Sequence, residues 1–486
     1  MRKPFSDQGR FDVEGIGNVQ LNLNCRDEII PILAALQYIY SKPELRDSIL
    51  NLVAKDVNRD TRRDVGREGL DDWSILVLAA VRLGCNLTYD KLHDLAEQHR
   101  ALRQLMGIGD WDSKTSFNWR RIRNTLCRLS PETIDEISHL IVAEGHTIEP
   151  QAAEKVRADS FVIETNIHHP TESGLIYDGV QKIIEFAVTI ATVMGLPGWR
   201  QHEHLLKQIK SLHRAIAISS RSKKPGAKKK REKLYRKLLK RAGKIIQRAE
   251  RLVSEAKTLN ADIMTVAQIA SVEIYVERTK QVMNTAFRRV VLGESVPNSD
   301  KLFSIFETHT QLYRRGKVAQ PNQFGRLVMV YEDASGFITH HYLLDRDQQD
   351  RDVVVEQTRI VQTRHGGEIK EASFDRGFYS EENETMLQEI IEHPCLPKTH
   401  PKAFAEQLKE ASVRFRKARQ RHSGIESAIG ALQSGNGLKR CRDRSELGFR
   451  RYLSLAVLGR NLHVLGKLLI QQRMPDSKAA ETRRAA

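Results

Sequence analysis

Three acidic residues, Asp159, Asp375 and Glu426, have the types and settings of a metal-dependent phosphoryl-transfer site. Asp159 lies inside a strand-like run, VRADSFVIE, where an acid is costly unless it faces solvent, a partner or a metal. Asp375 ends a second strand-like run before a turn with Gly377, a place where α/β folds put ligand-binding groups. Glu426 borders the apolar face of a helix-like segment. Carboxylates suit Mg²⁺, and two ions about 4 Å apart can activate an attacking hydroxyl and stabilise the leaving oxygen.

Each of these acids also has a simpler structural interpretation. Asp375 fits an ordinary strand-to-helix turn, and Glu426 follows many cations that could serve as ion-pair partners. Asp333 lies in a Gly-containing turn where Asp is common, so a structural role is favoured for it. Adjacent strand residues point to opposite faces, so His168-His169 and His340-His341 are poor zinc ligands and are predicted to be surface or loop residues.

The elements that would position the acids alternate between strands and helices. Short β-branched and aromatic runs bounded by turn residues predict the strands, and a turn ending in Gly336 predicts a β-hairpin. Pro394 predicts that the last strand lies at an edge of the sheet. In chain order the predicted strands are 156–164, 327–331, 337–344, 369–374 and 390–396, with a helix at 353–363 before the strand of Asp375.

Two helical regions accompany this pattern. The N-terminal region contains a nearly continuous apolar run, 70–83, and a short helix that carries Arg120, Arg121 and Arg123. It fits a DNA-contacting module and a purely packing domain equally well. A second helical region, 178–298, contains the basic run RSKKPGAKKKREKLYRKLLKRAGK. Its dense like charge favours phosphate binding over a merely solvated face.

Composition indicates a soluble globular protein with a polyanionic partner. The 486 residues include 78 basic and 61 acidic side chains, and the resulting net charge of +17 points first to nucleic acid. No run of about 18 apolar residues is present, which argues against a membrane span. The five cysteines are odd in number and far apart, which argues against a disulfide framework or structural zinc and favours the cytoplasm.

The sequence blocks around the acids resemble the DDE transposases of bacterial insertion sequences, and more closely their ISNCY-type group. The resemblance covers most of the chain apart from its C-terminal tail, and residues 70–127 are similar to the helical domain that commonly precedes such catalytic domains. The four ordered blocks are RADSFVIETNIHHPTESGLIYDGV with the first acid, the central FETHTQLYRRGKVAQPNQFGR, SFDRGFYSEEN with the second acid, and RHSGIESAIGALQSGNGL with the third.

This resemblance implies an α/β ribonuclease-H-like catalytic domain, a mixed sheet with flanking helices, that carries a large helical insert and follows a helical N-terminal domain. Asp159, Asp375 and Glu426 would be its catalytic triad and would hold two Mg²⁺ ions, with Mn²⁺ as a substitute. The chain departs from its relatives around Glu426. Where they often have Tyr, Arg and Lys, it has Arg419, His422 and Gln433, and Lys439 is the candidate for the missing cation. The insert also follows the first acid, whereas many relatives carry theirs before the Glu.

The implied activity is cleavage of DNA at the ends of the element and strand transfer into target DNA. It would be carried out by a homodimer or larger assembly on the terminal inverted repeats, in the cytoplasm and associated with the nucleoid. Two alternatives stay open: a catalytically inactive relative that regulates by binding DNA, and a ribonuclease-H-like nuclease that cuts without joining. The candidate DNA contacts are Arg120, Arg121, Arg123, Lys228, Lys229, Lys230, Arg231, Lys317, Arg326, Arg419, Arg421 and Lys439.

The predicted organisation has five parts. They are a helical DNA-binding and dimerisation domain at 1–150, the first part of the catalytic domain at 151–177, the helical basic insert at 178–298, the remainder of the catalytic domain at 299–470, and a disordered tail at 471–486.

Overall fold

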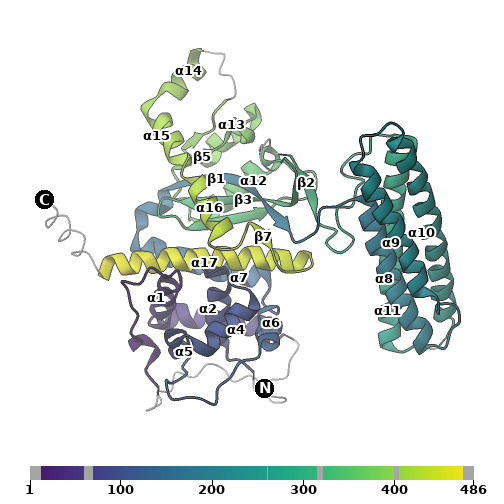
Figure 1. The fold of residues 1–486 in the computed structure, drawn as a ribbon. Coiled ribbons are helices and arrows are strands. Elements are labelled where there is room, and N and C mark those ends of the chain that lie inside the picture. The colour runs from purple at the N-terminus through teal and green to yellow at the C-terminus, as the bar shows by residue number, and fades with distance from the viewer. Residues whose placement is uncertain (1–12, 60–68, 260, 315–320, 399–403, 474–486) are drawn as a thin grey trace. The chain divides into compact units, whose positions relative to one another are not determined.

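The structure is a computed structural model that describes residues 13–59, 69–259, 261–314, 321–398 and 404–473. It is a mixed α/β protein, mostly helical (Figure 1). The chain forms two compact units: Met1–Glu164 together with Leu327–Ala486, and Thr165–Arg326. The second unit extends beyond the predicted insert at both ends. The N-terminal helices and most of the sheet, predicted as separate domains, fall within one unit, whereas β2 and the start of β3 belong to the other.

The described strands form one mixed sheet. Its central strand β1 (Lys155–Thr165) is flanked by β3 (Gln323–Asp333) on one side and β5 (Glu371–Phe374) on the other. β4 (Ile338–Leu343) pairs antiparallel with β3, while β5 is parallel to β1 and to β6 (His393–Cys395). The spatial order is therefore β4–β3–β1–β5–β6. Two short strands, β2 (Gln311–Tyr313) and β7 (Arg440–Cys441), pair with β3 and β1.

The local predictions for this region are confirmed. β3 and β4 form the predicted hairpin, and Gly336 in its turn has a φ of +90°, which glycine adopts without steric cost. β6 is the last strand of the sheet, so Pro394 does lie at an edge. Helix α12 (Asp350–Arg364) precedes β5, and α13 (Glu381–Ile390) follows it. The side chain of Ser380 accepts a hydrogen bond from the Asn383 amide, so α13 has the expected N-cap.

The N-terminal helices share one hydrophobic core with the sheet and the C-terminal helix α17 (Glu446–Arg473). In Figure 1, α17 runs between the sheet and these helices. α17 is long and apolar enough to cross a membrane, but most of it is buried. Its last turn includes residues 471–473, predicted as part of the tail, and 474–486 lie outside the described residues. The N-terminal helices are α1 (Ile29–Tyr40), α2 (Pro43–Val57), α3 (Asp72–Gly84), α4 (Tyr89–Gln98), α5 (Arg100–Leu105), α6 (Trp119–Leu126) and α7 (Pro131–Ile148).

The second unit is built on four long helices that pack side by side around their own core (Figure 1). The predicted basic helix is α10, which begins after Gly226 and turns Tyr235, Leu238 and Ile245 into the core while Lys228 stays exposed. This is the expected amphipathic pattern. The four helices are α8 (Glu172–Val193), α9 (His202–Arg221), α10 (Ala227–Lys257) and α11 (Ile263–Ala286).

The prediction of a surface position is wrong for His340. This residue lies on β4 with 8% of its surface exposed, because the β4 face that carries it is covered by α12. Its Nε2 is 2.8 Å from Oε1 of Gln357, and its Nδ1 is 3.2 Å from Nη1 of Arg364. A guanidinium can only donate, so Nδ1 accepts and Nε2–H donates to Gln357. The imidazole is therefore neutral, and burial lowers the pKa of His340 to about 3.

Acidification should destabilise the first unit through this histidine and two others. Burial lowers the pKa values of His365 and His463 to about 4 each, whereas the unfolded chain protonates its histidines near a pKa of about 6.5. The unfolded state therefore binds more protons below about pH 6.5, and stability present above that pH is lost as the pH falls toward the folded pKa values. Each histidine contributes a slope of up to about 1.4 kcal/mol per pH unit.

Urea unfolding at several pH values across this window measures the slope. His340→Gln should lower the number of protons taken up on unfolding by about one, and the slope falls accordingly. If the slope of the variant equals that of the wild type, His340 is not neutral in the folded protein.

Candidate active site

Two of the predicted acids lie side by side on adjacent parallel strands. The register of β1 and β5 pairs Ala158 with Phe374. The next residues along the two strand directions are Asp159 and Asp375. Asp375 still has an extended backbone, with φ −80° and ψ 167°. Parallel neighbours in register point their side chains to the same face. The two carboxylates therefore belong to one face of the sheet, where β5 ends.

The same face of the sheet is covered by helix α15 (Val413–His422). Alternation places Ser373 on the face of Asp375, and its hydroxyl lies 3.3 Å from Nδ1 of His422. Arg157, two residues before Asp159, donates from Nη1 to the Arg421 carbonyl oxygen at 2.7 Å. The end of α15 is thus fixed against β1 and β5 beside the two acids.

Glu426, the third predicted acid, lies in the first turn of helix α16 (Ile425–Ser434) and is exposed. Gly424, just before this helix, packs on Arg157 so closely that a Cβ would lie 2.9 Å from the guanidinium carbon. The start of α16 therefore borders the strand that carries Asp159. Figure 1 shows α15 and α16 beside β1 and β5. The structure brings the elements of all three acids to one part of the first unit.

Charged groups lie near these acids, and sequence analysis assigned a role only to Arg421 among them. Arg157 donates from Nε to Oε2 of Glu332 on β3 at 2.5 Å, with Glu332 buried. Burial raises the pKa of Glu332, and the hydrogen bond from Arg157 opposes this rise. Arg421 forms an ion pair with Glu371 on β5. Arg157 could have been found in the sequence, because strand alternation puts it on the face of Asp159 two residues later.

Among the titratable side chains at this face, His422 is of the type best suited to proton transfer. Burial lowers its pKa; the negative charge of Asp375 opposes this, and the cations Arg157 and Arg419 lower the pKa further. His422 is therefore neutral near pH 7. It occupies a position where the resemblance to DDE transposases predicts arginine, so α15 lacks the predicted cation there.

The donor chemistry of the three acids fits Mg²⁺, which prefers hard oxygen ligands and keeps several waters. One oxygen of Asp159 accepts a hydrogen bond from the Ser160 amide at 2.7 Å. Asp375 and Glu426 are both exposed, so water and a substrate phosphate can reach them. Within the described ranges, no three His, Cys, Asp or Glu side chains already form a group that could hold a metal ion. The three carboxylates would have to come closer together to hold one metal ion.

Most of the predicted DNA-contacting cations are exposed. Arg231 is half-buried, whereas Arg326 is only 4% exposed and lies within the protein. Its position does not support a direct phosphate contact. Lys317 lies outside the described residues. The exposed ones are Arg120, Arg121 and Arg123 on α6, Lys228, Lys229 and Lys230 on α10, Arg419 and Arg421 on α15, and Lys439 before β7.

Asp333 has the structural role that the sequence favours. It is buried, and its carboxylate accepts hydrogen bonds from the backbone amides of Ser335 and Phe337 in the hairpin turn, at 2.9 and 3.0 Å. His146 lies 2.8 Å from its other oxygen. With all of these partners inside the fold, Asp333 shapes the turn and is not a candidate for chemistry.

A scan against protein-family models, a search of curated proteins and a search of solved structures each found no match. The resemblance to DDE transposases therefore stays a prediction that rests on the four sequence blocks.

Proposed function

We propose that this protein is a DDE-type transposase that cleaves DNA strands and joins them to target DNA. The observation that carries the proposal is the register of β1 and β5, which sets Asp159 beside Asp375. Helix α15 and the start of α16 lie over the same face and bring Glu426 toward the pair. Three carboxylates from two strands and a helix could hold the two metal ions of phosphoryl transfer.

The strand order supports a ribonuclease-H-like sheet for this site. If residues 165–326 are set aside, the chain runs β1, then the hairpin of β3 and β4, then α12, β5, α13 and β6. The hairpin lies on one side of β1, and the two parallel strands lie on the other. The helical unit would then be an insertion between the first and second strands of the catalytic sheet.

In this proposal the acids of the site hold the metal ions, and the arginines position the helix and the DNA. The three carboxylates would hold two Mg²⁺ ions, which lower the pKa of an attacking hydroxyl and stabilise the leaving oxygen. Cleavage and joining are both attacks of a hydroxyl on a phosphodiester, so one site serves both steps. Arg157 holds the end of α15 against the sheet, and Arg419 on α15 is exposed where it can meet a DNA phosphate.

The test uses the full-length protein, Mg²⁺ and a supercoiled plasmid that carries the gene with its flanking DNA. Nicking at the element ends followed by joined products supports the proposal. Nicks without joined products would favour the nuclease, and DNA binding without nicks would favour the inactive regulator. Replacing Mg²⁺ with Ca²⁺ should keep binding and prevent cleavage, since Ca²⁺ takes looser and more variable coordination.

The basic start of α10 should account for much of the salt dependence of DNA binding. Neutralising Lys228, Lys229, Lys230 and Arg231 to glutamine removes up to four phosphate contacts, and each contact contributes about 0.9 to the slope of log K against log salt. The expected result is weaker binding and a slope reduced by about 2 to 4, measured by fluorescence anisotropy with duplex DNA.

A double substitution at exposed cations of α9, Lys207→Gln and Lys210→Gln, serves as the control for loss of charge. If the quadruple variant had the wild-type slope, the basic run would be a solvated face that does not contact DNA.

A further inference from the structure

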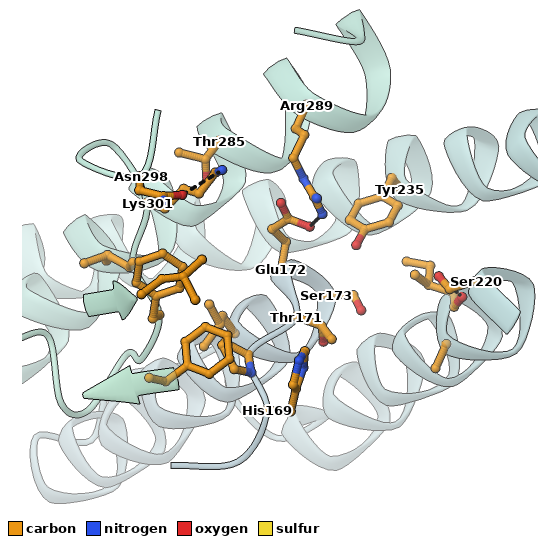
Figure 2. A pocket seen from close by; sticks show the side chains of 18 of the residues that line it. His169, Thr171, Glu172, Ser173, Ser220, Tyr235, Thr285, Arg289, Asn298 and Lys301 are labelled. Atoms are coloured by element: carbon orange, nitrogen blue, oxygen red, sulfur yellow. Dashed lines mark hydrogen bonds and ion pairs between the residues drawn. The ribbon is translucent and has the colours of Figure 1, made fainter. Parts of the chain in front are cut away.

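The second unit contains a cavity of about 510 Å³ that the proposed chemistry does not use (Figure 2). It is lined by the start of α8, the end of α9, Tyr235 of α10, residues near the end of α11, the segment 298–303, and the strands β2 and β3. All lining residues fall between 165 and 326 and so belong to one unit. Its volume lies within the range of small-molecule sites, about 300 to 1,000 Å³.

The cavity is strongly positive. Its charged lining consists of four cations, Arg221, Arg289, Lys301 and Arg314, and one carboxylate, Glu172. Glu172 forms an ion pair with Arg289, which leaves an excess of three positive charges. Burial lowers the pKa of Lys301, and the nearby charges of Arg289 and Arg314 lower it further. Like charges gathered in one hollow repel each other, and an anion with several charges would relieve that repulsion.

An aromatic wall lies beside these cations. The ring of Phe324 on β3 has its centroid 5.4 Å from that of His169 and 5.6 Å from that of Phe303. Phe324 is half-buried at the cavity, whereas Phe303 behind it is only 7% exposed. A half-exposed ring held by other rings offers a flat apolar surface. Aromatic surfaces beside cations are the combination that binds bases and phosphates together.

The cations of the cavity are held by neighbouring side chains. Lys301 donates to Oδ1 of Asn298 at 3.3 Å, so its ammonium is held by the loop that follows α11. Figure 2 shows Arg289 against Glu172 and Lys301 beside Asn298 and Thr285, with Tyr235 and Ser220 along the adjoining helices. The cations thus come from separate elements and face a shared space.

We infer that this cavity binds a nucleoside phosphate, with the phosphate between Lys301 and Arg314 and the base against Phe324. The site requires neither the three acids nor the exposed start of α10, so it stands independently of the proposed strand transfer. The same chemistry is offered by a free nucleotide and by the terminal nucleotide of a DNA strand.

The experiment is a titration of the full-length protein with the fluorescent nucleotide mant-dATP. Lys301→Gln should weaken binding about tenfold, the loss expected for one charge-assisted hydrogen bond. Phe324→Leu should weaken mant-dATP binding about tenfold through lost stacking, yet change competition by inorganic phosphate little. Lys210→Gln, an exposed cation on α9 outside the cavity lining, should bind like the wild type.

Circular dichroism melting checks that every variant is folded, and competition identifies the source of the nucleotide. Displacement by free dATP ahead of the dinucleotide pdTpdT assigns the cavity to a free nucleotide, and the reverse order assigns it to a strand terminus. Wild-type affinity in folded Lys301→Gln, equal losses in Lys210→Gln, or inorganic phosphate competing as well as dATP would overturn the inference.

Discussion

Asp375→Asn should lower the rate of Mg²⁺-dependent DNA cleavage by about 10³-fold or more, since a lost metal ligand costs about 4 kcal/mol of transition-state stabilisation. Asparagine keeps the shape of the side chain and removes the charge that the metal requires. Asp375 is exposed and lies just beyond β5, so the substitution leaves the core intact. Affinity for DNA should change by less than about twofold, because phosphate contacts come from cations elsewhere.

The matched control is Asp345→Asn. Asp345 is another exposed acid that follows a strand, β4, of the same sheet, and it has no place near β1 or β5 in the proposed site. Its variant should cleave at the wild-type rate. If Asp375→Asn cleaved DNA at that rate, the proposed triad would be wrong. If Asp345→Asn lost cleavage, the catalytic site would lie near the end of β4 instead. Gel-shift measurements on both variants separate a catalytic defect from lost binding.

The sheet and its acids could be predicted because their signals are local. Each signal spans fewer than about a dozen consecutive residues: the alternation around Asp159, the turn at Gly336 and the Ser380 cap. The pairing of β1 with β5 is not local, since residues 165–326 form a separate unit between the first strand and the rest of the sheet. Sequence analysis grouped Asp159 with Asp375 by their shared chemistry, and then by the resemblance, because no local pattern reports that the two strands pair.

Features that depend on packing between distant segments could not be predicted. Arg157 and Glu332 are 175 residues apart, and neither has a flanking pattern that marks it as part of a pair. The burial of His340 and Arg326 depends on what covers their strands, and a strand run with one polar residue looks the same whether that residue is covered or exposed. The positive cavity combines residues from four helices and two strands, so no stretch of sequence displays it.

The core shared by the N-terminal helices and α17 was likewise missed, and two glycines explain how it forms. At Gly459, α17 passes so close to α3 that a Cβ would lie 2.5 and 2.6 Å from the backbone nitrogen and Cα of Gly84. At Gly466, a Cβ would overlap the carbonyl oxygen of Pro31 in α1 and lie 2.5 Å from its carbonyl carbon. Backbone atoms cannot rotate away as a side chain can. The N-terminal helices are therefore fastened to the C-terminal helix by two close helix crossings.

Gly466→Ala should destabilise the first unit by about 3 kcal/mol or more, because the added methyl must push two helices of a dense core apart. Alanine favours a helix over glycine by about 1 kcal/mol, so the observed loss already includes that opposing gain. Urea unfolding followed by tryptophan fluorescence reports on it, since Trp73 is fully buried in α3 of the same core.

The control for Gly466→Ala is Gly430→Ala in α16, where a Cβ would meet nothing within 4 Å. That variant should gain about 0.5 to 1 kcal/mol from helix propensity alone. The opposite signs of the two changes would separate close helix packing from any general effect of replacing glycine. If Gly466→Ala proved as stable as the wild type, α1 and α17 would not be in backbone contact. The N-terminal helices could then move independently of the sheet that carries the acids.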